Sequence, residues 1–266
     1  MHVKVDDRAA FDVIGLMAQR ASHEIAPLAE VRITVLGSAR IGFDVFDGAD
    51  HLAAVGTPEE ALDCVFARVY RRAVELASLK GWLRVHGAVA GADGHRVAVV
   101  GPAGAGKTTL AVGLLCEGAA VEVDESFVIR DGEVMGVARR LHAQPGTFEL
   151  VTSASWAADA PAFGRSPVRL VDPTEHGFPW ALPRAPIEHV MVLRRTEGPS
   201  RMEPAPAALV VQEVIRQAFP VLEPRRVAVR QAANLASSAH CHSLHAGPDG
   251  RAPRLVMDLV DARPVS

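Results

Sequence analysis

The sequence predicts an α/β fold, in which a mixed sheet with flanking helices follows an N-terminal β element. Three observations predict it. Short β-branched stretches alternate with helical stretches along the chain. One of these stretches, at 97–100, runs through a glycine-rich turn directly into a helical segment at 110–117. The composition, with 49% hydrophobic and 22% charged residues, is that of a chain that buries a core.

Residues 1–80 are predicted to contain the N-terminal β element and one long helix. The stretches 31–35 and 41–46, separated by a Gly-Ser pair, predict a pair of strands. A helix at 58–79 is predicted from an N-cap, a proline at the first helical position and two acids in the first turn. These start residues are Thr57, Pro58, Glu59 and Glu60. We expect this part to be either a small subdomain or an integral part of the unit at 81–266.

The unit at 81–266 is predicted to combine strands and helices around the glycine-rich turn. In chain order the pattern predicts strands at 83–90 and 96–100, a helix at 110–117, a strand at 120–123, a hairpin across Asp131 and Gly132, a strand at 189–193, a helix at 207–219 and a strand at 239–245. Prolines interrupt the stretch from 145 to 190, so loops and short strands are expected there. Because long loops on a rigid scaffold commonly carry specificity, we expect specificity to reside in 150–190.

The glycine-rich turn satisfies the Walker A pattern in full. Its residues are Gly101, Pro102, Ala103, Gly104, Ala105, Gly106, Lys107 and Thr108, with Thr109 next. Glycines let successive backbone N–H groups point at phosphate oxygens, and the start of the following helix adds its positive end. We expect Lys107 to neutralise the β- and γ-phosphates and the Thr108 hydroxyl to ligate Mg²⁺, with Thr109 as the alternative ligand. The sequence thus predicts a nucleotide site that uses ATP and Mg²⁺.

Two adjacent acids, Asp124 and Glu125, follow the predicted strand at 120–123, and Asp124 comes 17 residues after Lys107. A site of this kind needs a carboxylate for the metal, and phosphate transfer also needs a group that orients the attacking hydroxyl. Neighbouring residues of a regular strand point to opposite faces, so both acids reach one site only if the chain bends there. One acid could then hold Mg²⁺ while the other lies near the acceptor.

Charge and composition argue against several classes of protein. The charges of 28 Lys+Arg and 31 Asp+Glu almost cancel, so no global field attracts nucleic acid or an anionic membrane. Aromatic residues make up only 5%, too few for a stacking platform for single strands. No secretory signal or long apolar span is evident, and three widely spaced cysteines argue against a disulfide framework, so a cytoplasmic protein is expected. No Asn-Lys-x-Asp or Leu-Ser-Gly-Gly-Gln segment occurs, which disfavours GTPases and transporter ATPases.

The residues around the Walker A pattern resemble a known family. His86-Gly87, a glycine turn, the strand at 97–100, the Walker A loop and the acid pair are similar to the catalytic domain of HPr kinase/phosphorylase and its smaller relatives, which include lasso-peptide kinases. The match is specific over 83–150. The resemblance implies a kinase fold related to phosphoenolpyruvate carboxykinase. It also implies transfer of the γ-phosphate of ATP to a serine-type hydroxyl of a peptide, protein or small molecule.

The resemblance also implies roles for individual residues. By motif position, Asp124 and His86 act on the acceptor hydroxyl, Lys107 offsets charge on the transferring group, and Glu125 helps to hold Mg²⁺ beside Thr108. The chain departs from the family in having Glu at the second acidic position and no Glu-Ile-Arg-Gly-Leu-Gly segment, so HPr itself and phosphorolysis are not expected. A nucleotide-binding regulatory module with little or no phosphotransfer is the alternative, as is a small-molecule kinase. The acceptor, ATP versus GTP preference and a homo-oligomeric state stay open.

Two further groups of residues invite a functional reading. Arg139 or Arg140 could touch phosphates or an acidic substrate, and a surface salt bridge is an equal alternative. His240 and His242 flank Cys241, and imidazole and thiolate are zinc ligands. Alternation along a strand would send Cys241 to the face opposite both histidines, so the sequence does not favour a zinc site there.

Overall fold

The computed structural model describes residues 2–5, 32–79, 81–136, 140–162, 167–178, 185–219 and 225–261. These residues form a mixed α/β protein. Among them, the main sheet has eight strands: β5 (Leu83–Ala92), β6 (His95–Val100), β7 (Ala120–Val123), β8 (Ser126–Arg130), β9 (Glu133–Gly136), β12 (His189–Arg195), β13 (Arg201–Pro204) and β14 (His240–Ala246). The helices that flank it are α3 (Lys107–Cys116), α5 (Ala207–Gln217), α6 (Arg225–Ser238) and α7 (Ala252–Asp261).

The strand order of the main sheet is β13-β14-β12-β6-β5-β8-β9, and β7 pairs with β5 beside β8. The central strands β6, β12 and β14 are parallel, whereas β5, β8, β9 and β13 are antiparallel to their neighbours. The sheet is therefore mixed, as the sequence predicts. Val100, the last residue of β6, is in register with Val192, so β12 continues to Arg195 beside the start of the glycine-rich turn.

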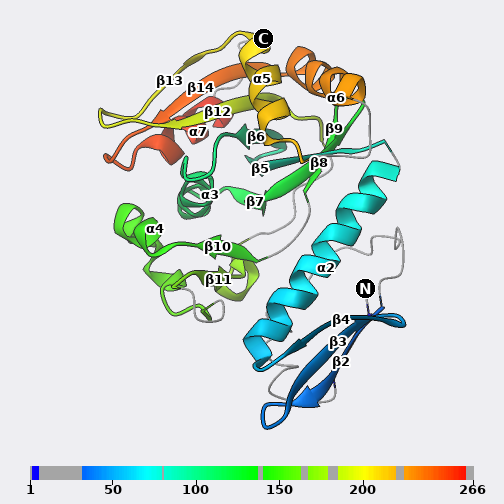
Figure 1. The fold of residues 1–266 in the computed structure, drawn as a ribbon. Coiled ribbons are helices and arrows are strands. Elements are labelled where there is room, and N and C mark those ends of the chain that lie inside the picture. The colour runs from blue at the N-terminus through cyan, green and yellow to red at the C-terminus, as the bar shows by residue number, and fades with distance from the viewer. Residues whose placement is uncertain are drawn as a thin grey trace.

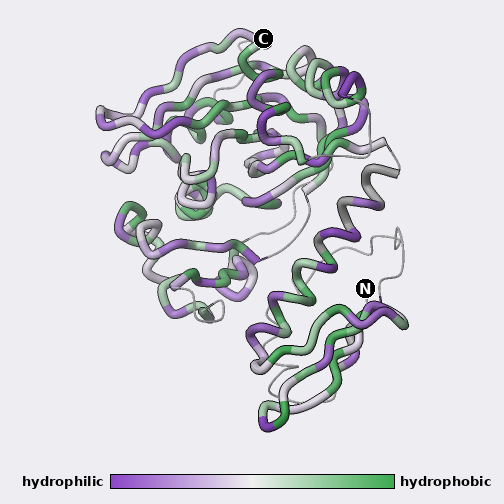
Figure 2. The backbone as a smooth tube through the Cα atoms, in the orientation of Figure 1, coloured by the Kyte–Doolittle hydropathy of each residue, from purple (hydrophilic) through white to green (hydrophobic). Residues whose placement is uncertain are grey.

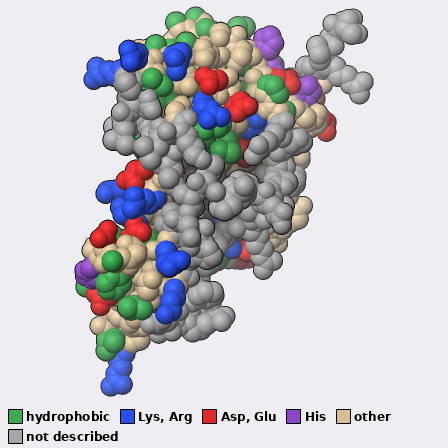
Figure 3. Space-filling view, turned by 90° about the vertical axis from the view of Figure 1, so that its right-hand side faces the viewer, with side chains coloured by type: hydrophobic (Ala, Val, Ile, Leu, Met, Phe, Trp, Pro, Cys, Tyr) green, Lys and Arg blue, Asp and Glu red, His purple; other side chains and the backbone are tan. Residues whose placement is uncertain are grey.

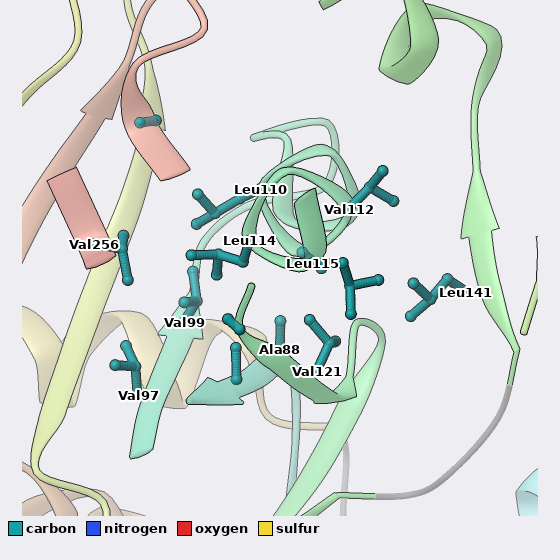
Figure 4. Close-up of a cluster of buried hydrophobic side chains, with 14 of the residues drawn as sticks. Ala88, Val97, Val99, Leu110, Val112, Leu114, Leu115, Val121, Leu141 and Val256 are labelled. Carbon is teal, nitrogen blue, oxygen red and sulfur yellow. The ribbon is translucent and has the colours of Figure 1, made fainter. Parts of the chain in front are cut away.

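Helices cover both faces of this sheet (Figure 1). Because neighbouring residues of a strand face opposite ways, β6 sends Val97 and Val99 to the layer of α3 and α7, and Ala98 and Val100 to the layer of α5 and α6. Figure 4 shows the first layer, where leucines of α3 pack against the sheet. A fully buried side chain of this size stabilises the fold by about 1.5–3 kcal/mol. These two layers fix the position of the glycine-rich turn between β6 and α3.

The N-terminal unit is a second sheet packed on a long helix. Its strands are β1 (His2–Val5), β2 (Arg32–Ser38), β3 (Gly42–Asp47) and β4 (Asp50–Val55), in that order, and its helix is α2 (Pro58–Leu79). Hydrophobic and hydrophilic residues alternate along α2 (Figure 2), which matches a helix with one packed face. Ile33, Val35, Phe43 and Val45 form a core of their own with residues of α2. The predicted boundary near residue 80 falls between α2 and β5, and independent folding of the two units stays a prediction.

A small two-stranded sheet completes the fold. It consists of β10 (Leu141–Ala143) and β11 (Arg169–Val171), with α4 (Pro145–Leu150) and the 3₁₀ helices η1 (Thr152–Ala157) and η2 (Pro173–His176) around it. Leu141 and Val171 pack into the same core layer as α3. The N-terminal unit also approaches this sheet, because the rings of Phe66 and His142 lie 5.8 Å apart.

The structure corrects several sequence expectations. The turn between the first two predicted strands lies at 39–41, not at Gly37 and Ser38, which end β2; Gly37 has φ 129° and a Cβ there would meet the Gly42 carbonyl oxygen. The strands β1, β4 and β13 and the helices α4, α6 and α7 are additional to those predicted. Helix α3 begins at Lys107, where the glycine-rich turn was expected to lead into a helix. Small and charged residues interrupt the apolar pattern of α6, whereas α7 buries Val256, Met257 and Val260 at helical spacing.

Three general properties of the described residues bear on function. No helix among them is long and apolar enough to cross a membrane. Positive and negative side chains are interspersed on the face in Figure 3. All three cysteines, Cys64, Cys116 and Cys241, are free and partly buried.

Candidate functional site

The glycine-rich loop lies between the end of β6 and the start of α3. Gly104 and Gly106 have φ values of 75° and 97°, a region that favours glycine. A Cβ at Gly101 would lie 2.6 Å from the carbonyl oxygen of Leu193, so the loop needs glycine where it passes β12. Gly106 precedes α3 and no side chain caps this helix among the described residues. Its first-turn N–H groups are therefore available to an anion.

Lys107 is held inside the loop. Its Nζ donates to the carbonyl oxygens of Gly101, at 2.9 Å, and Pro102, at 3.1 Å, and the residue is 6% exposed. Burial lowers the pKa of Lys107 below its ordinary value, while the negative charges of Glu125, Asp124 and Glu213 act to raise it. The buried ammonium of Lys107 thus lies near carboxylates at the N-terminus of α3. A phosphate bound there would be a further negative partner.

Asp124 meets the start of α3. The Thr108 hydroxyl donates to its Oδ2 at 2.9 Å, and the backbone N–H of His142 donates to the same oxygen at 3.3 Å. Asp124 is 1% exposed. The sheet explains this position: β7 pairs with β5, so Asp124, which follows β7, lies at the end of the sheet where α3 begins. Thr108 and Asp124 together present two hard oxygen ligands, the type that Mg²⁺ prefers.

Glu125 faces a different partner. Its Oε1 lies 3.6 Å from His86 Nδ1, and its carbonyl accepts a hydrogen bond from the N–H of Gly87 at 3.0 Å. The chain bends at Asp124 and Glu125, between β7 and β8, and both of these strands pair with β5. The chain therefore bends where a bend was the condition for both acids to reach one site, but the two acids contact different partners: Asp124 lies at Thr108 and Glu125 at His86.

Further charged residues surround the loop that the sequence did not single out. Glu213 of α5 is 1% exposed and accepts hydrogen bonds from Arg194 Nη2, at 2.8 Å, and Gln217 Nε2, at 2.9 Å. Arg194 lies in β12, one residue beyond Leu193, beside the glycine-rich loop. No local motif marks Glu213, because it is an acid on a regular helix whose place beside the loop depends on the packing of α5.

A hydroxyl pair lies on one side of the site and an aromatic ring on the other. Thr109 Oγ1 lies 3.1 Å from Thr147 Oγ1 of α4, so Thr109 faces the small sheet while Thr108 faces Asp124. Phe219 follows α5, and its ring lies 6.4 Å from that of His86 and 3.7 Å from the Arg84 guanidinium carbon. The ring of Phe219 therefore borders the acid pair on the side of His86.

Arg140, one of the two arginines singled out by the sequence, takes a structural position. Arg140 is 8% exposed and its Nη2 donates to Glu175 Oε1 at 2.8 Å, with Asp172 Oδ2 at 4.0 Å. This ion pair ties β10 to η2. Arg139 lies outside the described residues. The stretch 150–190 holds β11, η1 and η2 in its described part, next to α3 through η1.

A hollow of about 700 Å³ lies elsewhere, in the N-terminal unit. The turn between β2 and β3 and the end of β4 line it, and Ile41, 82% exposed, stands at its rim. It contains none of the residues of the glycine-rich loop. The hollow and the glycine-rich loop are therefore separate features of the molecule.

Thr108 and Asp124 offer oxygen ligands of the type that Mg²⁺ takes, and the start of α3 offers N–H groups to an anion. Among the described residues no group of three or more His, Cys, Asp and Glu side chains is placed to hold a metal, but Mg²⁺ needs few protein ligands when phosphates and waters supply the rest. No protein-family model matches this chain, and no curated protein matches it significantly. The chemistry and geometry of the site itself are therefore what point to a function.

Proposed function

We propose that this chain is an ATP-dependent kinase, similar to HPr kinase/phosphorylase, that transfers the γ-phosphate to a serine-type hydroxyl of a peptide, protein or small molecule. One observation carries the proposal: a full Walker A loop leads into an uncapped helix whose Thr108 hydroxyl donates to Asp124, while Lys107 is buried beside it. A strand-to-helix turn with an incidental lysine would not need a buried carboxylate at its first helical turn.

The roles follow from the partners of each group. The loop from Gly101 to Gly106 and the start of α3 would cradle the phosphates, and Lys107 would exchange its carbonyl partners for phosphate oxygens. Mg²⁺, when bound, would neutralise charge on the phosphates, with Thr108 and Asp124 as its protein ligands. Catalysis by these residues is mainly alignment and electrostatics.

The geometry favours an exchange of the two acidic roles implied by the family resemblance. That resemblance gives Asp124 to the acceptor and Glu125 to the metal. Asp124 contacts the metal-side hydroxyl of Thr108, whereas Glu125 lies at His86. We therefore assign Asp124 to Mg²⁺ and the Glu125–His86 pair to the acceptor hydroxyl, where a carboxylate that orients an imidazole suits a general base.

Nucleotide binding is tested first, by calorimetry with ATP and GTP in buffer that contains Mg²⁺. We expect heat of association with ATP that depends on Mg²⁺. Transfer is then tested with γ-labelled ATP and three acceptor classes: serine-containing peptides, whole-cell protein and free hydroxyl metabolites. A labelled product identifies the acceptor class. Absence of binding to either nucleotide would overturn the proposal.

A nucleotide-binding regulatory module is the second candidate. The observation that favours it is Glu125 in place of an aspartate, lying at His86 and not at Thr108. Tight ATP binding without any labelled product from the three acceptor classes would favour the module over the kinase. In both cases we propose action in the cytoplasm, because the free cysteines suit a reducing compartment.

A further inference from the structure

Histidines gather at the end of the main sheet opposite the glycine-rich loop. The parallel strands β6, β12 and β14 lead away from this end, and the loop follows the far end of β6. Figure 3 views the molecule from the side where β12 and β14 begin in Figure 1, and histidine side chains are visible at its upper right. None of these histidines belongs to the candidate nucleotide site.

The register of the sheet places three imidazoles on one face. His189 is in register with His240, and Met191 with His242. Residues two apart on a strand share a face, so His240 and His242 project on the same side as His189. The ring of His189 lies 5.5 Å from that of His240 and 5.3 Å from that of His242. Cys241 points the other way, where its Sγ lies 3.4 Å from the carbonyl oxygen of Ala236.

Two ring nitrogens in this group have the spacing of metal ligands. His189 Nδ1 and His242 Nε2 are 3.2 Å apart. Two imidazole nitrogens, each about 2.0–2.1 Å from one tetrahedral Zn²⁺, would be separated by about 3.3 Å. The pair therefore already has the nitrogen separation of two metal ligands, and the rings would turn so that both lone pairs point at the ion. Without an ion, the same spacing serves an N–H···N hydrogen bond between neutral rings.

The surroundings of both imidazoles favour the neutral ring over the protonated one. Burial and the nearby His240 lower the pKa of His242, and burial followed by His242 and His240 lowers that of His189, with Glu188 acting to raise it. A neutral imidazole keeps a lone pair for a metal. The acid Glu188 is already engaged by His95, with Oε2 and Nδ1 2.6 Å apart.

We propose that His189 and His242 form a two-histidine site for a divalent transition metal such as Ni²⁺, Cu²⁺ or Zn²⁺, completed by water. Nitrogen ligands select these ions, whereas Mg²⁺ selects oxygen ligands, so the site is chemically separate from the one at Thr108 and Asp124. Because the two ligands come from neighbouring strands, a bound ion ties the start of β12 to the start of β14.

The site is tested by calorimetry with Ni²⁺ in excess Mg²⁺, on the full chain without a polyhistidine tag. We expect one ion per chain at this site, with affinity at least tenfold weaker in His189→Gln and in His242→Gln. Cys241→Ser is the matched control, because it lies between two histidines but on the opposite face, and it should leave the affinity unchanged. Equal affinity in the wild type and the His189→Gln/His242→Gln double variant would overturn the proposal.

A second measurement needs no variant. The Cu²⁺ complex of the wild type should show electron paramagnetic resonance coupling to imidazole nitrogens, and Ni²⁺ should raise the thermal transition of the chain, because a ligand that binds the folded state stabilises it. A Cu²⁺ spectrum without imidazole coupling would reject the site. Nucleotide binding at the other end of the sheet is not involved in either readout.

Discussion

The helices α2 and α3 begin in opposite ways. At the start of α2, Thr57 Oγ1 accepts from the N–H of Glu60 at 3.2 Å, and Glu60 Oε2 accepts from the N–H groups of Thr57, at 3.3 Å, and Gly56, at 2.8 Å. The first donors of this helix are thus satisfied by its own side chains, in a capping box. At the start of α3, Gly106 has φ 97° and provides no side chain.

The start of α2 stabilises the fold, whereas the start of α3 can bind an anion. A capped terminus contributes about 0.5–2 kcal/mol to folding and has few N–H groups left for a ligand. An uncapped terminus forgoes that stabilisation but keeps its donors and its positive end for phosphate. Buried contacts offset the missing cap of α3, because most of its residues are buried in the main core, whereas only one face of α2 packs on its sheet.

The largest expected effect comes from the buried cation at the uncapped helix. Lys107→Met keeps the length of the side chain but removes its charge, so phosphate transfer should fall about 100-fold or more. The measurement is the rate of label transfer from γ-labelled ATP, with circular dichroism to establish the fold. Lys4→Met is the control, since Lys4 is exposed on β1. An unchanged rate of phosphate transfer in Lys107→Met would show that the start of α3 does not take part in the proposed reaction.

Substitutions of Asp124 and Glu125 should affect different kinetic quantities. Asp124→Asn keeps an oxygen that can accept from Thr108 but loses the charge for Mg²⁺, so the Mg²⁺ concentration for half-maximal transfer should rise at least tenfold. Glu125→Gln should instead lower the maximal rate about 100-fold with little change in Mg²⁺ dependence. The reverse pattern would restore the assignment given by the family resemblance, with Glu125 on the metal.

The strand that carries His86 should tolerate no side chain at Gly87. A Cβ there would lie 2.4 Å from the Phe127 ring and 2.6 Å from the Val99 carbonyl oxygen. Gly87→Ala should therefore lower the free energy of unfolding by about 1–3 kcal/mol, measured by urea denaturation. Gly146→Ala is the control, because a Cβ at Gly146 has nothing within 4 Å. Equal stability of the two variants would contradict the packing described at His86.

The smallest effect is expected at the capped helix. Thr57→Ala removes the acceptor for the Glu60 N–H and should lower the free energy of unfolding by about 1 kcal/mol, with nucleotide affinity unchanged. Thr57→Ser restores the hydroxyl and should restore most of the stability. A loss of nucleotide affinity in Thr57→Ala would show that the two helix starts are coupled, and the comparison would fail.

Local patterns predicted much of the fold and part of the site. The start of α2 at Pro58, the strand β6 and the glycine-rich loop are each set by residues close in sequence, and the structure has them at or near the predicted positions. Helices α6 and α7 were not predicted: small and charged residues weaken the periodicity of α6, whereas α7 has apolar residues at helical spacing that were not recognised. The partners Glu213 and Arg194 could not be predicted, since they come 106 and 87 residues after Lys107 and meet the loop only through the packing of α5 and β12.

The sequence by itself determined the chemistry that this protein offers: a loop of glycines, one lysine at the start of a helix, and two adjacent acids after the next strand. These are local features, because turns and helix starts depend on residues within a few positions of one another. Only the tertiary structure decided that Asp124 meets Thr108 while Glu125 meets His86, and that His189 meets His242 at the far end of the sheet. Such pairings depend on strand order and register, which bring distant segments together.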